Sequence, residues 1–313
     1  ARGERVLVVC ADPADVPRLA QEMPWFEPNL DVRPLPDWET LPYDVLSPQE
    51  ELVSERLEAL YRLTAPTGGA DVLLTSAVTA SQRLSPVSYI GANTFFFHQG
   101  EQISLTTLQK RLAAAGYANV KQVLAAGEFA VRGSIVDVFP MGSERPFRLD
   151  FFDDEIESIR WFDVDTQRSM ESAEEIRLLP GHEFPVDPEA LLAFRQRWRR
   201  EFAGDPKKSI VYCDIEKEIL PPGIEYYLPL FFDETAALTD YLPPNARVFL
   251  LGDIEAALQA FGRDMASRYK VLAADPQRPA LAPERIWLKP EEFFKSLANF
   301  ARFTVEKKRT QRI

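Results

Sequence analysis

The chain of 313 residues contains few histidines and cysteines, the side chains that typically bind zinc or form disulfides. It has two histidines, His98 and His182, and two cysteines, Cys10 and Cys213, with no two of them at metal-ligand spacing. The sequence therefore predicts no metal site and no disulfide framework. We interpret both histidines as structural or surface residues and both cysteines as inert buried thiols. So few thiols favour a reducing cytoplasm as the location.

Several motifs of enzymes and membrane proteins are also missing. The sequence has no GxxxxGK[ST] phosphate loop, no GxGxxG turn and no GxSxG nucleophile elbow, which leaves no evident cofactor-binding or catalytic residues. No apolar run approaches the roughly 18–20 residues of a membrane-spanning helix, and no signal peptide is visible. We therefore expect a non-enzymatic chain that has no cofactor and no membrane segment.

Positive charge is scarce relative to negative charge. The chain has 36 Lys and Arg residues against 48 Asp and Glu residues, which gives a net charge of −12. Because lysine and arginine neutralise phosphates in nucleic-acid complexes, this balance predicts no general affinity for DNA or for anionic membranes. The four arginines between residues 195 and 200 are interpreted as a solvated helix face, with an anion or partner patch as the alternative. Asp153-Asp154-Glu155 is interpreted as a hairpin turn rather than a magnesium site.

The apolar residues, 46% of the chain, predict folded domains whose character changes along the sequence. In the first third, buried strands at residues 6–9 and 71–75 alternate with helices, which is typical of a parallel sheet. A capping box at Ser47-Pro48-Gln49-Glu50 predicts a helix with proline at its first position. Towards the end of the chain, α/β patterning returns, with strands at 247–251 and 285–288 and helices at 253–269 and 290–299.

The middle of the chain has a different period. After a strand at residues 94–98 and a helix that begins at Ser104 and ends at Gly116, apolar residues alternate. The alternating segments are 129–139, 147–152 and 156–162, with reversals at 141–144 and 153–155, and they predict an antiparallel meander. A proline-rich stretch at 180–188 predicts a boundary. We therefore expect an α/β fold split around an inserted α+β domain, with segments 1–93, 94–180 and 181–305 and the start of a linker at 306–313.

One face of the meander has an unusual composition. Alternation places an arginine and an aromatic residue together on the face that should meet solvent. Arginine with an aromatic residue is typical of protein-binding hot spots, whereas the alternative is an exposed phenylalanine beside an incidental ion pair. The outward residues are Arg132, Ser134, Arg148, Asp150 and Phe152, and the expected core-facing residues are Phe129, Val131, Ile135, Phe147, Leu149 and Phe151.

Four segments resemble the N-terminal module of the bacterial transcription-repair coupling factors, the Mfd family. They are residues 37–44 (DWETLPYD), 132–143 (RGSIVDVFPMGS), 148–156 (RLDFFDDEI) and 223–227 (GIEYY). The second and third segments also resemble UvrB, the helicase-like protein of nucleotide-excision repair, whereas the first and fourth favour the coupling factors. The resemblance extends over essentially the whole chain.

The resemblance implies a helicase-like, UvrB-like α/β domain split around an inserted domain, which in the family binds UvrA, the damage-recognition ATPase. The family's contact residues correspond to Arg132, Arg148 and Phe152, with Ser134 and Asp150 as weaker neighbours. These are also the residues that the strand pattern selects. The phosphate loop of UvrB would lie upstream of residues 6–9, and the DNA-clamping hairpin of UvrB is too long for residues 43–47. Both departures favour a module that binds UvrA as UvrB does but does not act on DNA as UvrB does.

The expected function is therefore a non-catalytic module that recruits UvrA to stalled RNA polymerase in a bacterial cytoplasm. The family also implies an ATP-hydrolysing DNA translocase as the parent protein, with polymerase-binding and motor segments beyond Ile313. It further implies a masking contact between the UvrA-binding surface and the C-terminal part of the parent. The alternatives are a UvrB-like, nucleotide-dependent protein that binds damaged DNA, and a Rossmann-type enzyme that has only the α/β pattern in its favour.

Overall fold

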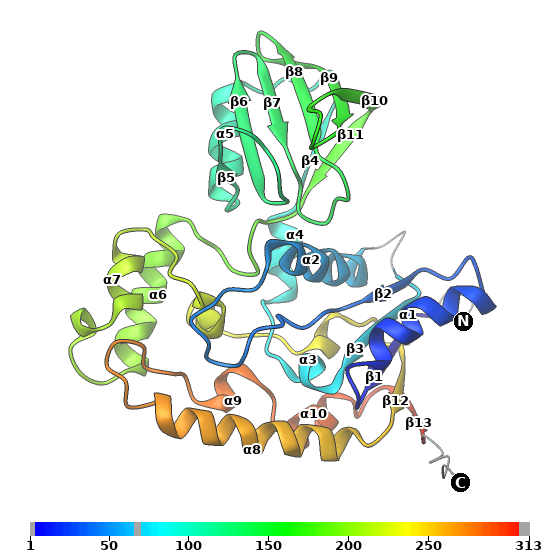
Figure 1. Ribbon diagram of the computed structural model, residues 1–313, viewed down its shortest axis with the longest axis vertical. Helices are drawn as coiled ribbons and strands as arrows, with labels where there is room; N and C mark the ends of the chain where they lie inside the picture. The colour runs from blue at the N-terminus through cyan, green and yellow to red at the C-terminus, as the bar shows by residue number, and fades with distance from the viewer. Residues whose placement is uncertain (1–3, 66–69, 307–313) are drawn as a thin grey trace. The chain divides into compact units, whose positions relative to one another are not determined.

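The computed structural model describes residues 4–65 and 70–306, which form two compact units (Figure 1). Unit 1 contains the described residues of 1–47, 59–87 and 194–313, and unit 2 contains residues 48–58 and 88–193. Three helices are divided between the units along their length: α2 (Glu50–Thr64), α4 (Val87–Ala92) and α6 (Pro188–Glu201). None of the described helices is both long enough and apolar enough to cross a membrane.

Unit 1 is built on a five-stranded sheet in which all neighbouring strands are parallel. The strand order is β13 (Ala301–Val305), β12 (Arg247–Leu251), β1 (Val6–Cys10), β3 (Val72–Ser76) and β2 (Val32–Pro34). Helix α1 (Asp15–Phe26) covers one face, where Leu19 and Met23 pack against the cluster that contains Val8 and Leu74. The almost wholly apolar sequences of β1 and β3 follow from this position, because a parallel sheet is covered on both faces.

Several helices complete unit 1. Helix α3 (Ala77–Ser81) packs against β1, β3 and α8, and it begins at Ser76, whose hydroxyl accepts a hydrogen bond from the backbone N–H of Thr79. Helix α8 (Ile254–Leu272) begins at Asp253, whose carboxylate accepts in the same way from Ala256. The others are α7 (Ile210–Glu216), α9 (Pro283–Ile286), α10 (Pro290–Ser296) and the 3-10 helices η1 (Pro206–Lys208), η2 (Ile224–Leu230) and η3 (Leu238–Tyr241).

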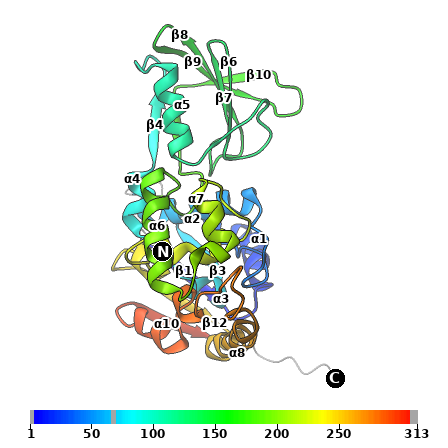
Figure 2. The same ribbon diagram turned by 90° about the vertical axis from the view of Figure 1, so that its left-hand side faces the viewer.

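Unit 2 contains a six-stranded sheet of order β10–β9–β8–β7–β6–β5 (Figures 1 and 2). Strands β6 to β10 form an antiparallel meander, and the short β5 pairs in parallel with β6. Their bounds are β5 (Ala118–Asn119), β6 (Glu128–Arg132), β7 (Ile135–Val138), β8 (Phe147–Phe152), β9 (Glu155–Phe162) and β10 (Ser169–Ala173). Helix α5 (Leu105–Ala114) lies alongside this sheet, and β4 (Phe95–His98) pairs antiparallel with β11 (Glu175–Leu178). The predicted mixed α/β fold, with a parallel sheet and an antiparallel meander, is confirmed.

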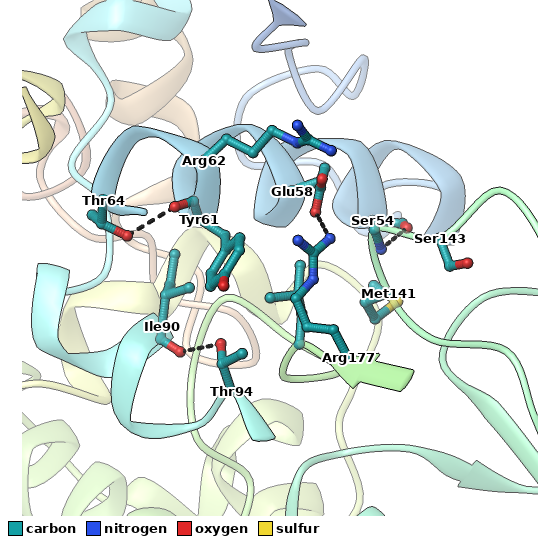
Figure 3. Close-up of polar contacts among 12 residues, drawn as sticks. Ser54, Glu58, Tyr61, Arg62, Thr64, Ile90, Thr94, Met141, Ser143 and Arg177 are labelled. Carbon is teal, nitrogen blue, oxygen red and sulfur yellow. Dashed lines mark hydrogen bonds and ion pairs between the residues drawn. The ribbon is translucent and has the colours of Figure 1, made fainter. Parts of the chain in front are cut away.

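Two ion pairs hold the first half of α2 within unit 2. The guanidinium of Arg56, whose side chain is fully buried, donates to the two carboxylate oxygens of Glu183 at 2.6 and 3.2 Å. Close by on the same helix, Glu58 pairs with Arg177 of β11 (Figure 3). Truncating one partner of a buried ion pair costs about 3–5 kcal/mol. The pair of Arg56 and Glu183 is therefore an important attachment of α2 to the C-terminal part of unit 2.

The meander differs from the sequence prediction in one place. Residues 129–139 are two strands rather than one, because Gly133 and Ser134 make a two-residue turn between β6 and β7. Gly133 has φ +64°, a left-handed conformation that glycine adopts without steric cost and that tight hairpins use at this position. The turn places Ile135 opposite Arg132. Ile135 therefore lies on the outward face, and the prediction that it faces the core is wrong.

Other local predictions also fail. Helix α2 begins at Glu50 without the predicted cap, because the Ser47 hydroxyl instead donates to Glu225 at 2.9 Å and accepts from the N–H of Gly223 at 3.0 Å. Residues 285–288, predicted as a strand, overlap helix α9, which has proline at its first position. Strand β13 was not predicted, and residues 307–313 of the predicted linker lie outside the described residues.

Candidate protein-binding site

The outward face of the meander, called the outer face below, is formed by alternate residues of β6, β7 and β8. The strand register sets Arg132 opposite Ile135, Ile135 opposite Asp150, and Asp137 opposite Arg148, and directly opposed residues share a face. The other face is buried, and Phe129, Val136, Val138, Leu149 and Phe151 are each at most 5% exposed. The outer face comprises Arg132, Ile135, Asp137, Arg148, Asp150 and Phe152.

Asp137 is the buried centre of the outer face, with 1% of its side chain exposed. Its carboxylate accepts hydrogen bonds from two arginines. Arg148 donates through Nε to Oδ1 at 2.6 Å and through Nη2 to Oδ2 at 3.0 Å, and Arg132 donates through Nη2 to Oδ2. Two guanidinium groups thus share one carboxylate, so the cluster keeps one excess positive charge.

Arg148 is largely covered by the chain, with 14% of its side chain exposed. Its Nη1 donates to the backbone oxygen of Gln167 at 3.1 Å and to Oγ of Ser169 at 3.3 Å. Its guanidinium lies 4.9 Å from the ring centroid of Phe162. The hydrogen bonds to Asp137 raise the pKa of Arg148. Of the five N–H donors of a guanidinium, Arg148 thus uses four within the chain.

Arg132 is far more accessible, with 49% of its side chain exposed. Among the residues that the structure describes, its Nη2 donates to Asp137, whereas Nε and Nη1 have no hydrogen-bond partner. Arg132 therefore keeps most of its donors for another molecule. Arginine suits carboxylates and carbonyl oxygens in this role because its donors are planar and permanently charged.

Phe152 is the exposed aromatic residue of the outer face, and the residue is 69% exposed. It ends β8 directly before a turn in which Asp153 has φ +52°. The backbone N–H of the preceding residue, Phe151, donates to the carbonyl oxygen of Ser134 at 2.8 Å. This bond ties the end of β8 to the turn that follows Arg132. The exposed arginine and the exposed phenylalanine therefore lie at the same end of the meander.

The two weaker candidates flank this end. Ser134 is exposed in the turn between β6 and β7. Asp150 lies opposite Ile135 and accepts a hydrogen bond from Oγ of Ser158 at 2.7 Å. The structure thus brings the predicted residues onto or beside one face of one sheet, with Arg132, Ser134 and Phe152 at the same end. Their role in binding a partner stays a prediction.

The sequence reasoning missed Asp137, the residue that joins the two arginines. The signal for it was present. Once Gly133-Ser134 is identified as a two-residue hairpin turn, alternation places Asp137 on the face that carries Arg132. Its neighbours Val136 and Val138 are buried on the opposite face.

Other candidate residues are held in structural contacts. In the basic run of α6, Arg195 lies 3.7 Å from Glu216, Arg197 lies 2.6 Å from Asp233, and the guanidinium of Arg199 lies over the Tyr212 ring. Cys10 is buried as predicted, but Cys213 is only half-buried, and the prediction of a buried thiol there is wrong. Residues 153 and 154 form the predicted hairpin turn between β8 and β9. Within the described residues, no group of three or more His, Cys, Asp or Glu side chains is arranged to hold a metal ion.

Comparisons with known proteins found one matching family model and several relatives. The family model for the UvrB interaction domain matches residues 95–184, which include the whole outer face. The chain is 42% identical to the transcription-repair-coupling factor of Escherichia coli K12 over 298 residues, 95% of this chain and 26% of that protein. It is also 42% identical to the Haemophilus influenzae factor over 301 residues, with the same coverage. The Bacillus subtilis factor is 32% identical over 216 residues, 64% of this chain and 18% of that protein.

The antiparallel meander of unit 2 thus lies in a UvrB interaction domain. With 42% identity over 95% of its residues, the chain belongs to the transcription-repair-coupling factor family. It spans about a quarter of the length of these relatives, 26% in the first two. The predicted resemblance to the Mfd family is confirmed.

Proposed function

We propose that this chain is a non-catalytic module of a transcription-repair coupling factor and that it recruits UvrA through the outer face of the meander. The observation that carries the proposal is the pair of exposed side chains, Arg132 and Phe152, at one end of a UvrB interaction domain. An exposed aromatic ring beside an arginine has the composition of a binding hot spot. The net charge of −12 also favours a protein partner over nucleic acid.

For the parent protein, we propose that UvrA is brought to RNA polymerase stalled at damaged DNA in the bacterial cytoplasm. ATP-driven translocation and polymerase binding would belong to polypeptide outside this chain, which spans 26% of the Escherichia coli relative. A contact between the outer face and the C-terminal part of the parent would mask the UvrA site. In the same proposal, segments 1–93 and 181–305 form a helicase-like domain that is split around the inserted segment 94–180.

The test is the affinity of the chain for purified UvrA. Truncating an interfacial charge typically costs about 2–5 kcal/mol, so we expect Arg132→Ala and Arg148→Ala each to weaken UvrA binding by about 30-fold or more. Phe152→Ala should also weaken UvrA binding, because the contact area of the exposed ring would be lost. Isothermal titration calorimetry measures all three variants.

The matched control is Arg111→Ala, which removes an exposed arginine from α5, a helix that contributes no residue to the outer face. Its affinity for UvrA should equal that of the unchanged chain. Circular dichroism verifies that each variant is folded. Unchanged affinity in the folded Arg132→Ala and Arg148→Ala variants would falsify the assignment of UvrA to the outer face.

The alternative function is UvrB-like nucleotide-dependent binding of damaged DNA. The place to look for a nucleotide site is the carboxyl ends of β1 and β12. Sheets of this kind bind nucleotides at such a position, and a hollow of about 790 Å³ lies there. Its described lining includes Asp12, Asp15, Asp253 and Glu255 and contains no lysine or arginine. Carboxylates repel phosphate groups, so the charge of this hollow supports the non-catalytic proposal.

A further inference from the structure

We propose that Asp137 is a positioning residue for Arg132, and that Arg148 acts on the bound partner through Asp137 rather than by direct contact. The inference rests on the proposed function, in which the outer face binds UvrA. It deepens that function by giving different roles to two arginines that sequence alternation treats as equivalent.

Accessibility separates the two arginines. The side chain of Arg132 is 49% exposed and donates one hydrogen bond within the described residues, whereas that of Arg148 is 14% exposed and donates four. A partner that approaches the outer face finds most donors of Arg132 available. It finds one unused donor of Arg148, on a side chain that is only 14% exposed, and it reaches the other four only by displacing Asp137, Gln167 or Ser169.

Asp137 is what holds Arg132 in place. A free arginine side chain has many rotamers, and immobilising it on binding costs free energy. The hydrogen bond from Nη2 of Arg132 to the buried carboxylate restricts those rotamers before any partner arrives. The carboxylate also separates two positive groups that would otherwise repel each other across β6, β7 and β8.

Arg148 fixes the carboxylate itself. Its Nε and Nη2 bind both oxygens of Asp137 in the paired geometry that arginine forms with carboxylates. The backbone oxygen of Gln167 and the ring of Phe162 hold the guanidinium from the other side. Without Arg148, the carboxylate has only Arg132 as a cationic partner. It would then draw the donors of Arg132 inward and make them less available to UvrA.

The experiment is a double-mutant cycle in which calorimetry measures affinity for purified UvrA. With Arg132 present, we expect Asp137→Asn to weaken binding by about tenfold or more and Arg148→Ala by about 30-fold or more. In the Arg132→Ala background, the same substitutions should change affinity by less than about twofold, because they act only through Arg132.

Phe152 provides the matched control, because its ring has no hydrogen bond to Asp137. The effects of Phe152→Ala and Asp137→Asn should add. Arg148→Lys offers a variant that keeps the charge if the neutral substitutions do not fold. Because an ammonium group cannot form the paired geometry, Arg148→Lys should also weaken binding only when Arg132 is present.

The outcomes separate this inference from the function on which it rests. If Arg148→Ala or Arg148→Lys keeps its full effect in the Arg132→Ala background, Arg148 contacts UvrA directly and the positioning role is overturned. If Arg132→Ala and Phe152→Ala leave the affinity unchanged, the UvrA assignment itself fails, and the inference fails with it. A merely structural role for Asp137 would weaken binding equally in both backgrounds, which would also overturn the proposal.

Discussion

The two histidines of the chain have different surroundings. His98 has 59% of its side chain exposed, beside the carboxylates of Glu101 and Glu175. His182 is half-buried, and its ring stacks on Phe184 with centroids 5.4 Å apart. A Cβ added to Gly116 would come within 2.7 Å of that ring. This packing disfavours the charged imidazolium and lowers the pKa of His182 to about 4.

The low pKa of His182 predicts a loss of stability in acid. Between about pH 6.5 and pH 4 the unfolded chain binds a proton at this residue and the folded chain does not, so stability falls as pH decreases through this window. Because the ring is only half-buried, we expect a loss of about 1–3 kcal/mol. Urea unfolding at pH 7 and pH 4.5 measures it, with His182→Asn as the comparison that removes the titrating group. Equal losses in both proteins would contradict the prediction, as would an NMR titration of His182 near pH 6.5.

Sequence reasoning identified the exposed members of the outer face better than its buried members. Arg132 and Phe152 follow from strand alternation and the rarity of an aromatic residue on a solvated face. The separate roles of Arg148 and Asp137 depend on which residues stand opposite each other. That register depends on the turn at Gly133 and on the connection between β7 and β8. A local pattern does not contain this information until the turn is placed.

At the scale of elements, the turn between β6 and β7 allows a direct test. Gly133 has φ +64° and nothing lies within 4 Å of an added Cβ, so Gly133→Ala introduces backbone strain without a clash. We expect it to lower the free energy of unfolding by about 1–2 kcal/mol. The control is Gly91→Ala in α4, which also has nothing within 4 Å but no positive φ. It should be neutral or stabilising, because alanine favours helices. Equal effects in urea unfolding would show that the left-handed backbone carries no cost.

The elements that were predicted well have strong local signals. Ser104 caps α5 and Asp187 caps α6 with side-chain hydrogen bonds, and Gly116 follows α5 with φ +89°. The failures involve contacts with distant parts of the chain. The Ser47 hydroxyl forms hydrogen bonds with Gly223 and Glu225, more than 170 residues away, rather than with the helix that follows it. Strand β13 is exposed at all five positions, so it has no buried face to produce an alternating pattern.

At the scale of the whole molecule, the allocation of residues 48–58 to unit 2 was not foreseeable from the sequence. This segment is joined to the end of the unit by Arg56–Glu183 and Glu58–Arg177, pairs that are 127 and 119 residues apart. Charged residues on a helix are usually read as a solvated face. Only the folded chain shows that Arg56 is buried.

The charge of the whole chain leads to a prediction about nucleic acid and nucleotide. The chain has a net charge of −12, and carboxylates line the hollow at β1 and β12, so it repels phosphate groups. We expect no binding of ATP at micromolar concentration. We also expect no binding of a labelled DNA duplex below about 10⁻⁴ M at 0.15 M salt. Fluorescence anisotropy and calorimetry measure both. Micromolar affinity for either ligand would revive the UvrB-like alternative.

The carboxylate shared by two arginines also restricts how this surface can change over generations. If Asp137 is lost alone, two like charges are left side by side, and if Arg148 is lost alone, Arg132 is drawn towards the carboxylate. Each single substitution in the trio is therefore costly, and replacing all three would remove the exposed donors of Arg132 as well. Among related proteins, we expect Arg132, Asp137 and Arg148 to be retained together, whereas Ser134 and Asp150 beside them should vary more freely.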